Sequence, residues 1–209
     1  HTMKTVLFSC DFGGGLGHIA NLTRFAAVLK HHRVRTVFAL KNPRMEPFLD
    51  AGAEVFQAPS WPMAPASENY VPDSTATMND QLVSAGLSDE QILRPVLQSW
   101  DGIFKTVAPD LVIADYAPAA SMMSHGRIPL IVVGNGFTAP PGKMKRFPLL
   151  HRMAPPRWSE DETLQAVNRV LRSLSRPALE CLPQIFAGDA QIVLTFPVLD
   201  PYDLQRSEP

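Results

Sequence analysis

The chain has little excess charge, few cysteines and no long apolar run. Its 209 residues include 19 lysines and arginines and 20 acidic residues, which gives a formal net charge of −1. Such a balance provides no electrostatic attraction for nucleic acid or for an anionic membrane surface. The apolar runs are much shorter than a membrane span, and no signal peptide opens the sequence. We therefore expect a cytoplasmic protein with neither a membrane span nor a nucleic-acid partner.

The two cysteines, Cys10 and Cys181, do not stand in any metal-binding spacing. Such sparse cysteine usage fits a reduced protein in which both are core residues. The adjacent histidines His31 and His32 point apart on a helix, so they do not form a ligand pair. We expect no metal site and no resident cofactor.

Three familiar catalytic motifs are also missing. A phosphate-binding P-loop requires a lysine after its glycines, and none follows Gly13–Gly17. A dinucleotide site requires a third glycine where this chain has His18, and an acidic residue where it has Lys41 and Asn42. The G-x-S-x-G turn of many serine hydrolases is absent. A nucleoside triphosphatase, a nicotinamide enzyme and such a hydrolase are therefore disfavoured.

Six short apolar runs alternate with helical patterns along the chain. This alternation predicts an α/β fold: a Rossmann-like, doubly wound parallel sheet of about six strands with helices on both faces. In the common strand order 3-2-1-4-5-6, the first and fourth strands are neighbours at the topological switch point. The expected strands are Lys4–Cys10, Arg35–Leu40, Ala53–Gln57, Asp110–Asp115, Pro129–Asn135 and Gln191–Phe196.

Helical periodicity and capping residues locate the helices between these strands. After the first strand, an apolar face is formed by Ile19, Leu22, Ala26 and Leu29. We expect the next helix to begin at Asn42–Pro43 and to end near Gly52. Two capping boxes, Ser88–Gln91 and Ser159–Glu162, predict the starts of two later helices. The first of these helices has a core stripe of Ile92, Val96, Trp100 and Phe104. A small helix is expected between these two helices, and it ends near Gly126.

Proline is abundant, with 20 residues in the chain. The prolines cluster at 59–72, 140–156 and 197–209, outside the apolar runs. We interpret the first two clusters as long surface loops and the third as the start of a linker. The predicted organisation is a tag remnant and start methionine at residues 1–3, one domain at 4–199, and the beginning of an interdomain linker at 200–209.

The topology brings His18 and Asp115 to one crevice. His18 lies in the glycine-rich segment after the first strand, and Asp115 ends the fourth. An imidazole there can accept a proton near pH 7, and a carboxylate can hold its other ring nitrogen. Backbone N–H groups of the loop, at Gly14, Gly15 and Gly17, suit a phosphate. Equally, Asp115 can be a helix cap and His18 an ordinary first-turn residue, and from the residues alone both interpretations stay open.

Four segments in order resemble one enzyme family. "FGGGLGHIANLTRFAAVL" is similar to the amino-terminal segment of GT-B-fold glycosyltransferases of the UDP-glycosyltransferase type. "LVIADYAPAA" is similar to their fourth strand, and "GNGFTAPP" resembles the loop after strand five in bacterial members. "LTFPVLDPY" resembles their last strand before the interdomain linker. The resemblance covers nearly the whole chain.

This resemblance implies a reaction and its residues. His18 would be the base that deprotonates an acceptor hydroxyl, with Asp115 orienting it. The loop of Gly14, Gly15 and Gly17 would face the diphosphate and the acceptor. The co-substrate would be a nucleotide-diphosphate sugar, in this family usually a UDP-sugar, with no metal. Bacterial glycosyltransferases that act on cell-wall lipid intermediates have a similar Gly-Gly-His turn.

One large part of the family pattern is missing. These enzymes have a second Rossmann-like domain that binds most of the nucleotide sugar, and its glycine-rich signature is absent from this sequence. We therefore expect the amino-terminal, acceptor-binding domain, inactive by itself. Two alternatives stay open: a natural half-enzyme that pairs with a separate donor-binding subunit, and a non-catalytic module that binds a phosphorylated or hydrophobic ligand.

Acceptor recognition is expected from loops at the crevice. Their apolar and aromatic side chains suit a lipophilic or aromatic small molecule. The alternative for each residue is that it only packs its own loop. The candidate contacts are Trp61, Met63, Tyr70, Asn135, Phe137, Met144 and Phe147.

Overall fold

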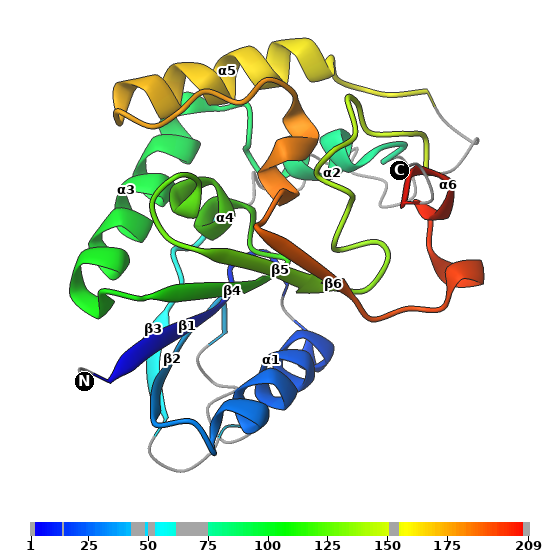
Figure 1. The fold of residues 1–209 in the computed structure, drawn as a ribbon. Coiled ribbons are helices and arrows are strands. Elements are labelled where there is room, and N and C mark those ends of the chain that lie inside the picture. Colours follow the sequence, from blue (N-terminus) through cyan, green and yellow to red (C-terminus); the bar gives the residue numbers. More distant parts are fainter. Residues whose placement is uncertain are drawn as a thin grey trace.

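The sheet at the centre of the molecule confirms the predicted fold class. A computed structural model describes residues 3–13, 15–42, 49, 53–61, 75–150 and 155–206. Six strands form one sheet in the order β3-β2-β1-β4-β5-β6, and every neighbouring pair is parallel (Figure 1). The strands are β1 (Lys4–Cys10), β2 (Val34–Leu40), β3 (Glu54–Gln57), β4 (Leu111–Asp115), β5 (Leu130–Gly134) and β6 (Ala190–Val193).

Five strands lie within one residue of their predicted bounds, but the prediction for β6 was wrong at its carboxyl end. The apolar run predicts a strand through Phe196, whereas β6 ends at Val193. Val193 pairs with Gly134, the last residue of β5, so no partner strand continues beyond it. The chain instead turns into a short 3-10 helix at Pro197–Leu199. An apolar run without a neighbouring strand does not extend the sheet.

The helices follow the predicted alternation, except that α2 and α6 are additional and one cap is shifted. The first helix buries Ile19, Leu22 and Ala26 as its periodicity predicts. The predicted helix that begins at residues 42–43 lies almost wholly outside the described residues. The helices are α1 (Leu16–Leu29), α2 (Met78–Ser84), α3 (Glu90–Val107), α4 (Pro118–Ser124), α5 (Glu160–Ser173) and α6 (Asp203–Arg206), with 3-10 helices η3 (Leu182–Phe186) and η4 (Pro197–Leu199). None of the helices in the described ranges is both long and apolar enough to cross a membrane.

The capping predictions were only partly correct. Ser159 caps α5 by accepting from the Glu162 amide, as predicted. The cap of α3 is Asp89 rather than Ser88, because the Asp89 carboxylate accepts from the Gln91 amide at 2.8 Å. The sequence analysis missed α2, which begins with a capping box between Thr77 and an aspartate three residues later.

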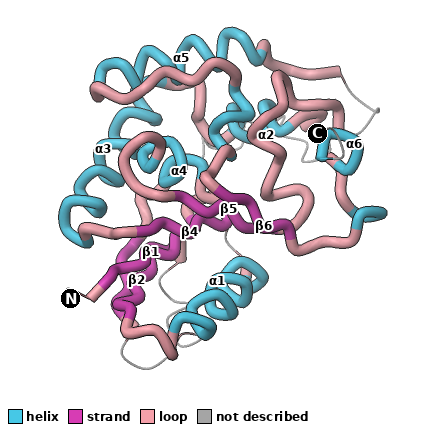
Figure 2. The backbone as a smooth tube through the Cα atoms, in the orientation of Figure 1, coloured by secondary structure: helices cyan, strands magenta, loops and turns pink. Residues whose placement is uncertain are grey.

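Two hydrophobic cores lie on opposite faces of the sheet. On one face, α1 covers the side chains of Val6, Phe8 and Cys10 from β1. On the other face lies the larger core, formed with α2 to α5 and including Leu7 and Trp100. Figures 1 and 2 show α1 on one side of the sheet and α3, α4 and α5 on the other. The arrangement is doubly wound, so the carboxyl ends of β1 and β4 open between the two layers.

The segment after β6 packs on this domain through two side chains. Tyr202 is fully buried. Arg206 donates to Asp200, to Gln191 and to the carbonyl oxygens of residues 136 and 139. Residues 200–206, which the sequence places at the start of a linker, are therefore anchored to the β5–β6 side of the sheet.

Candidate active site

The predicted pair of His18 and Asp115 comes together at the carboxyl edge of the sheet. Asp115 is the last residue of β4, the strand that pairs with β1. His18 is in the first turn of α1, which follows β1 through the glycine-rich loop. His18 Nδ1 lies 2.8 Å from Asp115 Oδ1, so the predicted contact is confirmed. The Asp115 side chain is fully buried, and that of His18 is 19% exposed.

The contact determines which nitrogen of the ring is free. An ionised carboxylate only accepts hydrogen bonds, so beside an ionised Asp115 the proton of the ring would sit on His18 Nδ1 and be donated to Oδ1. In the neutral ring, Nε2 then has the free lone pair. This is the arrangement of a general base whose tautomer is fixed by a buried acid.

Asn21 is a further residue of this site, and it was not predicted from the sequence. Its Nδ2 donates to Asp115 Oδ2 at 3.1 Å, so both oxygens of the buried carboxylate are held from α1. Three positions along a helix place Asn21 and His18 on the same face. That spacing, read together with the acid at the end of β4, was the signal that could have identified Asn21.

The glycine that matters for packing is Gly13, not those singled out from the sequence. A Cβ on Gly13 would lie 2.4 Å from His18 Cδ2 and Nε2, so the imidazole lies directly against this backbone. Added Cβ atoms on Gly15 and Gly17 would meet nothing within 4 Å. The third predicted glycine, Gly14, lies outside the described residues.

Hydrogen bonds hold the glycine loop in place. The Cys10 thiol donates to the Gly13 carbonyl oxygen at 3.1 Å, and Lys41 Nζ donates to the Phe12 carbonyl oxygen at 3.2 Å. Burial, reinforced by the negative charge of Asp115, raises the pKa of the Cys10 thiol. Cys10 is therefore a neutral structural donor rather than a nucleophile.

Tyr116 forms a second wall of the site and was also missed. It follows Asp115 directly and has a φ of +48°, a left-handed conformation that is rare for a bulky residue. Its ring stacks on that of His18, with 6.0 Å between the centroids and 26° between the planes. Its carbonyl oxygen accepts from the Phe12 amide at 3.1 Å. Backbone strain of this kind concentrates at functional sites.

Of the described acceptor candidates, one contacts a wall of this site. Phe137 is 36% exposed, and its ring lies edge-on to Tyr116 with centroids 6.2 Å apart. Asn135 is exposed, but its side-chain oxygen accepts two bonds from Thr138 and so closes its own turn. Met63 and Tyr70 lie outside the described residues.

The other described candidates are core residues. Trp61 is 5% exposed and lies edge-on to Phe12, with centroids 5.5 Å apart. Met144 and Phe147 are also buried in the larger core. A surface loop containing an aromatic residue gives no indication of which way its ring turns, so the sequence does not separate these from Phe137.

A second acid, Asp11, lies behind the dyad and is fully buried. Its Oδ2 accepts from Trp100 Nε1 at 2.9 Å and from the Ala120 amide at 3.2 Å. Among the described residues, its Oδ1 has no hydrogen-bond partner, nor has Trp61 Nε1. Burial raises the pKa of Asp11 to about 7. An acid directly after an apolar strand is unusual, and this was the available signal for it.

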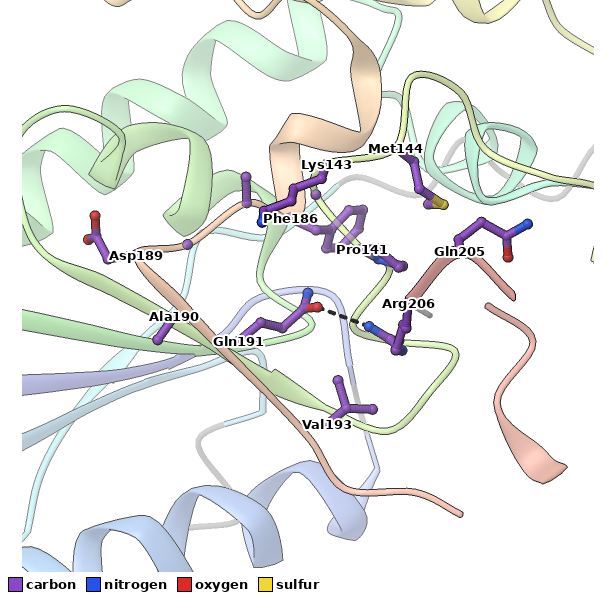
Figure 3. Close-up of a pocket in the computed structure, with 13 residues that line it drawn as sticks. Pro141, Lys143, Met144, Phe186, Asp189, Ala190, Gln191, Val193, Gln205 and Arg206 are labelled. Atoms are coloured by element: carbon purple, nitrogen blue, oxygen red, sulfur yellow. Dashed lines mark hydrogen bonds between the residues drawn. The ribbon is translucent and has the colours of Figure 1, made fainter. Parts of the chain in front are cut away.

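A pocket of about 510 Å³ lies away from the pair of His18 and Asp115. It is bounded by the 141–144 loop, by β6 and by α6, and Figure 3 shows Gln191 bonded to Arg206 at its floor. The Arg206 guanidinium donates four hydrogen bonds, to Asp200, to Gln191 and to two backbone carbonyl oxygens. No three His, Cys, Asp or Glu side chains in the described ranges are grouped to hold a metal ion.

Solved structures that match this fold include glycosyltransferases. The glycotransferase of kitacinnamycin matches with a TM-score of 0.59 and 16% identity, over 97% of this chain and 49% of that chain. The calicheamicin glycosyltransferase CalG4 matches with a TM-score of 0.54 and 15% identity, over 100% of this chain and 50% of that chain. The glycosyltransferase SsfS6, from Streptomyces sp. SF2575, matches with a TM-score of 0.53 and 14% identity, over 92% of this chain and 50% of that chain.

At these identities the likeness establishes the fold alone. This chain spans about half the length of these glycosyltransferases. No protein-family model matches the sequence, and no curated protein matches it either.

Proposed function

We propose that this chain is the acceptor-binding half of a glycosyltransferase that moves a sugar from a nucleotide-diphosphate sugar to an acceptor hydroxyl. The observation that supports this most is the 2.8 Å contact between His18 Nδ1 and the buried Asp115 carboxylate. It lies at the carboxyl edge of a sheet whose fold matches about half the length of two solved glycosyltransferases. Open α/β sheets bind their ligands at this edge, beside the switch point.

In the proposed reaction, His18 is the general base and Asp115 is its partner. His18 Nε2 takes the proton of the acceptor hydroxyl while the acceptor oxygen forms a bond to the anomeric carbon of the sugar. The bond between that carbon and the diphosphate oxygen breaks, and the diphosphate leaves with the electron pair. Asp115 stabilises the imidazolium that forms. A positioned base of this kind contributes roughly 10²- to 10⁴-fold in rate.

The start of α1 is proposed to face the diphosphate. Gly15 is the N-cap of this helix and supplies no side-chain hydrogen bond to it, and Gly17 lies in the first turn. The unbonded N–H groups and the positive end of the helix dipole favour an anion. We extend this role to Gly14 from the sequence alone.

The acceptor is proposed to lie against Phe137 and Tyr116. The partly exposed Phe137 ring and the stacked pair of Tyr116 and His18 give the base an aromatic surround. Aromatic and apolar walls with a single positioned polar group suit a lipophilic or aromatic acceptor that presents one hydroxyl. Met63, Tyr70 and Asn135 remain candidates for further contacts.

A donor-binding domain is proposed to cover the chain after β6. Phe196, Val198, Leu199 and Leu204 are exposed by 73%, 90%, 70% and 78%. They follow the carboxyl end of the edge strand β6, close in sequence to one another. Consecutive exposed apolar side chains are typical of a surface that packs against a partner. The partner domain, in the same chain or in a separate subunit, would bind the nucleotide sugar, by analogy a UDP-sugar.

The test is a pair of assays on the 209-residue chain. Calorimetry with UDP, UDP-sugars and hydroxylated aromatic acceptors measures binding, and a transfer assay is run with and without a donor-binding half supplied in trans. We expect weak acceptor binding, no transfer by the chain alone, and transfer once the second half is present. Tight UDP-sugar binding or multiple turnover by the isolated chain would contradict the proposal. Acceptor binding with no transfer in either assay would favour the non-catalytic module.

A further inference from the structure

Both oxygens of the Asp115 carboxylate are held by side chains of one helix. His18 Nδ1 contacts Oδ1 at 2.8 Å, and Asn21 Nδ2 donates to Oδ2 at 3.1 Å. The carboxylate itself is fully buried at the end of β4. Two donors on two oxygens fix the plane of a carboxylate, whereas a single donor leaves it free to rotate. The direction in which Oδ1 points toward His18 therefore depends on Asn21.

The second donor is a neutral amide rather than a cation. An amide N–H stabilises the charged form of a carboxylate without cancelling its charge. A lysine or arginine in the same place would neutralise Asp115 and weaken its hold on an imidazolium. No lysine or arginine in the described ranges forms an ion pair with Asp115. The negative charge therefore stays directed at His18.

The other titratable groups nearby do not replace Asn21. Cys10 on β1 is neutral, because burial and the charge of Asp115 raise its pKa. Lys41, which also faces Cys10, donates to the Phe12 carbonyl oxygen. Asp11 is bonded on the other side, to Trp100 and to the backbone of α4. Only His18 and Asn21 donate a hydrogen bond to the Asp115 carboxylate within the part of the chain that is described.

We propose that Asn21 is a positioning residue of the site, so that the functional unit is a triad of His18, Asp115 and Asn21. This proposal rests on the proposed function of His18 as a base. Asn21 holds Asp115 Oδ2, which keeps Oδ1 as an acceptor and holds the imidazole proton on Nδ1. His18 Nε2 is then left free toward the acceptor. Without Asn21, the buried Oδ2 has lost its donor, and the ring loses its preference for the Nδ1–H tautomer.

A purely structural role makes a different prediction. If Asn21 only ties α1 to β4, removing its amide lowers the melting temperature but leaves the His18 tautomer unchanged. The tautomer of a histidine can be assigned from the chemical shifts of its two ring nitrogens. This measurement does not depend on sugar transfer, so it separates the two roles in the chain as it stands.

The experiment is nitrogen-15 NMR of the 209-residue chain with labelled histidine, at a pH where the imidazole is neutral. Asn21→Ala removes the amide and leaves a small side chain, and Asn21→Leu removes hydrogen bonding while keeping a side chain of similar size. Thr23→Val, on the same helix, is the matched control, because its hydroxyl donates to the carbonyl oxygen of Ala20 within its own helix. Circular dichroism confirms that each variant is folded.

We expect wild type and Thr23→Val to hold His18 as the Nδ1–H tautomer. In both Asn21 variants, the ratio of Nε2–H to Nδ1–H is expected to rise by about tenfold or more, the effect of losing a hydrogen bond to a charged group. If one variant fails to fold, the other decides. A wild-type tautomer ratio in a folded Asn21 variant would overturn the proposal and leave the proposed transfer reaction untouched. A shifted ratio in a protein that never transfers sugar would instead sink the proposed function alone.

Discussion

Two buried acids lie at the same edge of the sheet and have opposite surroundings. Asp11 comes one residue after β1 and Asp115 ends β4, and both are fully buried. Asp115 is held from α1, by His18 and Asn21. Asp11 is held from the other layer, by Trp100 Nε1 on α3 and by an amide of α4.

The difference lies in what each acid holds. The partner of Asp115 is an imidazole that is partly exposed, and under the proposed function this imidazole takes the proton of the acceptor. The donors to Asp11 are an indole and a backbone amide, which do not titrate and are buried. Asp11 therefore ties the end of β1 to α3 and α4. Equal burial of two acids says nothing about their roles until their donors are known.

The largest expected effect is the pH dependence that Asp11 gives to folding. Burial raises its pKa from an ordinary 3.8 to about 7, so the folded state binds its proton more tightly than the unfolded state does. The stabilisation is complete below the unfolded value, near pH 4, and is lost as the pH rises through about 7. The shift corresponds to roughly 4 kcal/mol in the free energy of unfolding. Urea denaturation between pH 4 and pH 8 measures it.

Asp11→Asn should remove most of this slope, because an amide keeps an acceptor oxygen for Trp100 and does not titrate. Glu160→Gln is the control, because burial raises the pKa of this half-buried acid as well. An unchanged pH dependence of the free energy of unfolding in Asp11→Asn would contradict the assignment of this dependence to Asp11.

The next effect belongs to the Asp115 side. Gly13→Ala would place a Cβ in the space of two ring atoms of His18, so the imidazole or the glycine loop must shift and the contact with Asp115 is disturbed. We expect turnover of the enzyme with both halves to fall by about 10²-fold, which is the cost of a misplaced catalytic group. Gly102→Ala, in α3 with open space around it, should leave turnover unchanged. Equal turnover in the two variants would refute the claim that Gly13 shapes the dyad.

A smaller effect is expected where the Asp115 side meets the acceptor. Phe137→Ala removes a partly exposed ring that contacts Tyr116. We expect the KM for an aromatic acceptor to rise by about tenfold, because apolar contact area is lost, while kcat changes little. Val28→Ala, at an exposed position far along α1, is the control. Steady-state kinetics with varied acceptor makes the measurement, and an unchanged KM would remove Phe137 from the acceptor site.

The sequence was sufficient for the sheet and for the central contact. Apolar runs and helical periodicity predict the strand order, and that order alone places His18 near Asp115. The residues that pack around His18 could not be predicted from the sequence. The role of Tyr116 depends on a left-handed backbone conformation, and that of Gly13 depends on the imidazole packed against it. Neither is visible in a one-dimensional pattern.

The prediction of acceptor residues failed where packing decides. Trp61 lies in a proline-rich stretch that is typical of an exposed loop. Its ring is nevertheless buried in the core, edge-on to Phe12. Asn135 has the right position, yet its side chain closes a turn with Thr138. Phe137 is more exposed than Trp61, and its edge-on contact is with Tyr116, which no local sequence feature reports.

The most direct test of the account is the turnover of His18→Ala in the enzyme that has both halves. We predict a fall of roughly 10²- to 10⁴-fold with nucleotide-sugar affinity nearly unchanged, since the base acts on the acceptor alone. Asp115→Asn should cost less, because Asp115 only orients and stabilises the ring. Wild-type turnover in His18→Ala would contradict the account and reduce His18 to an ordinary residue at the start of a helix.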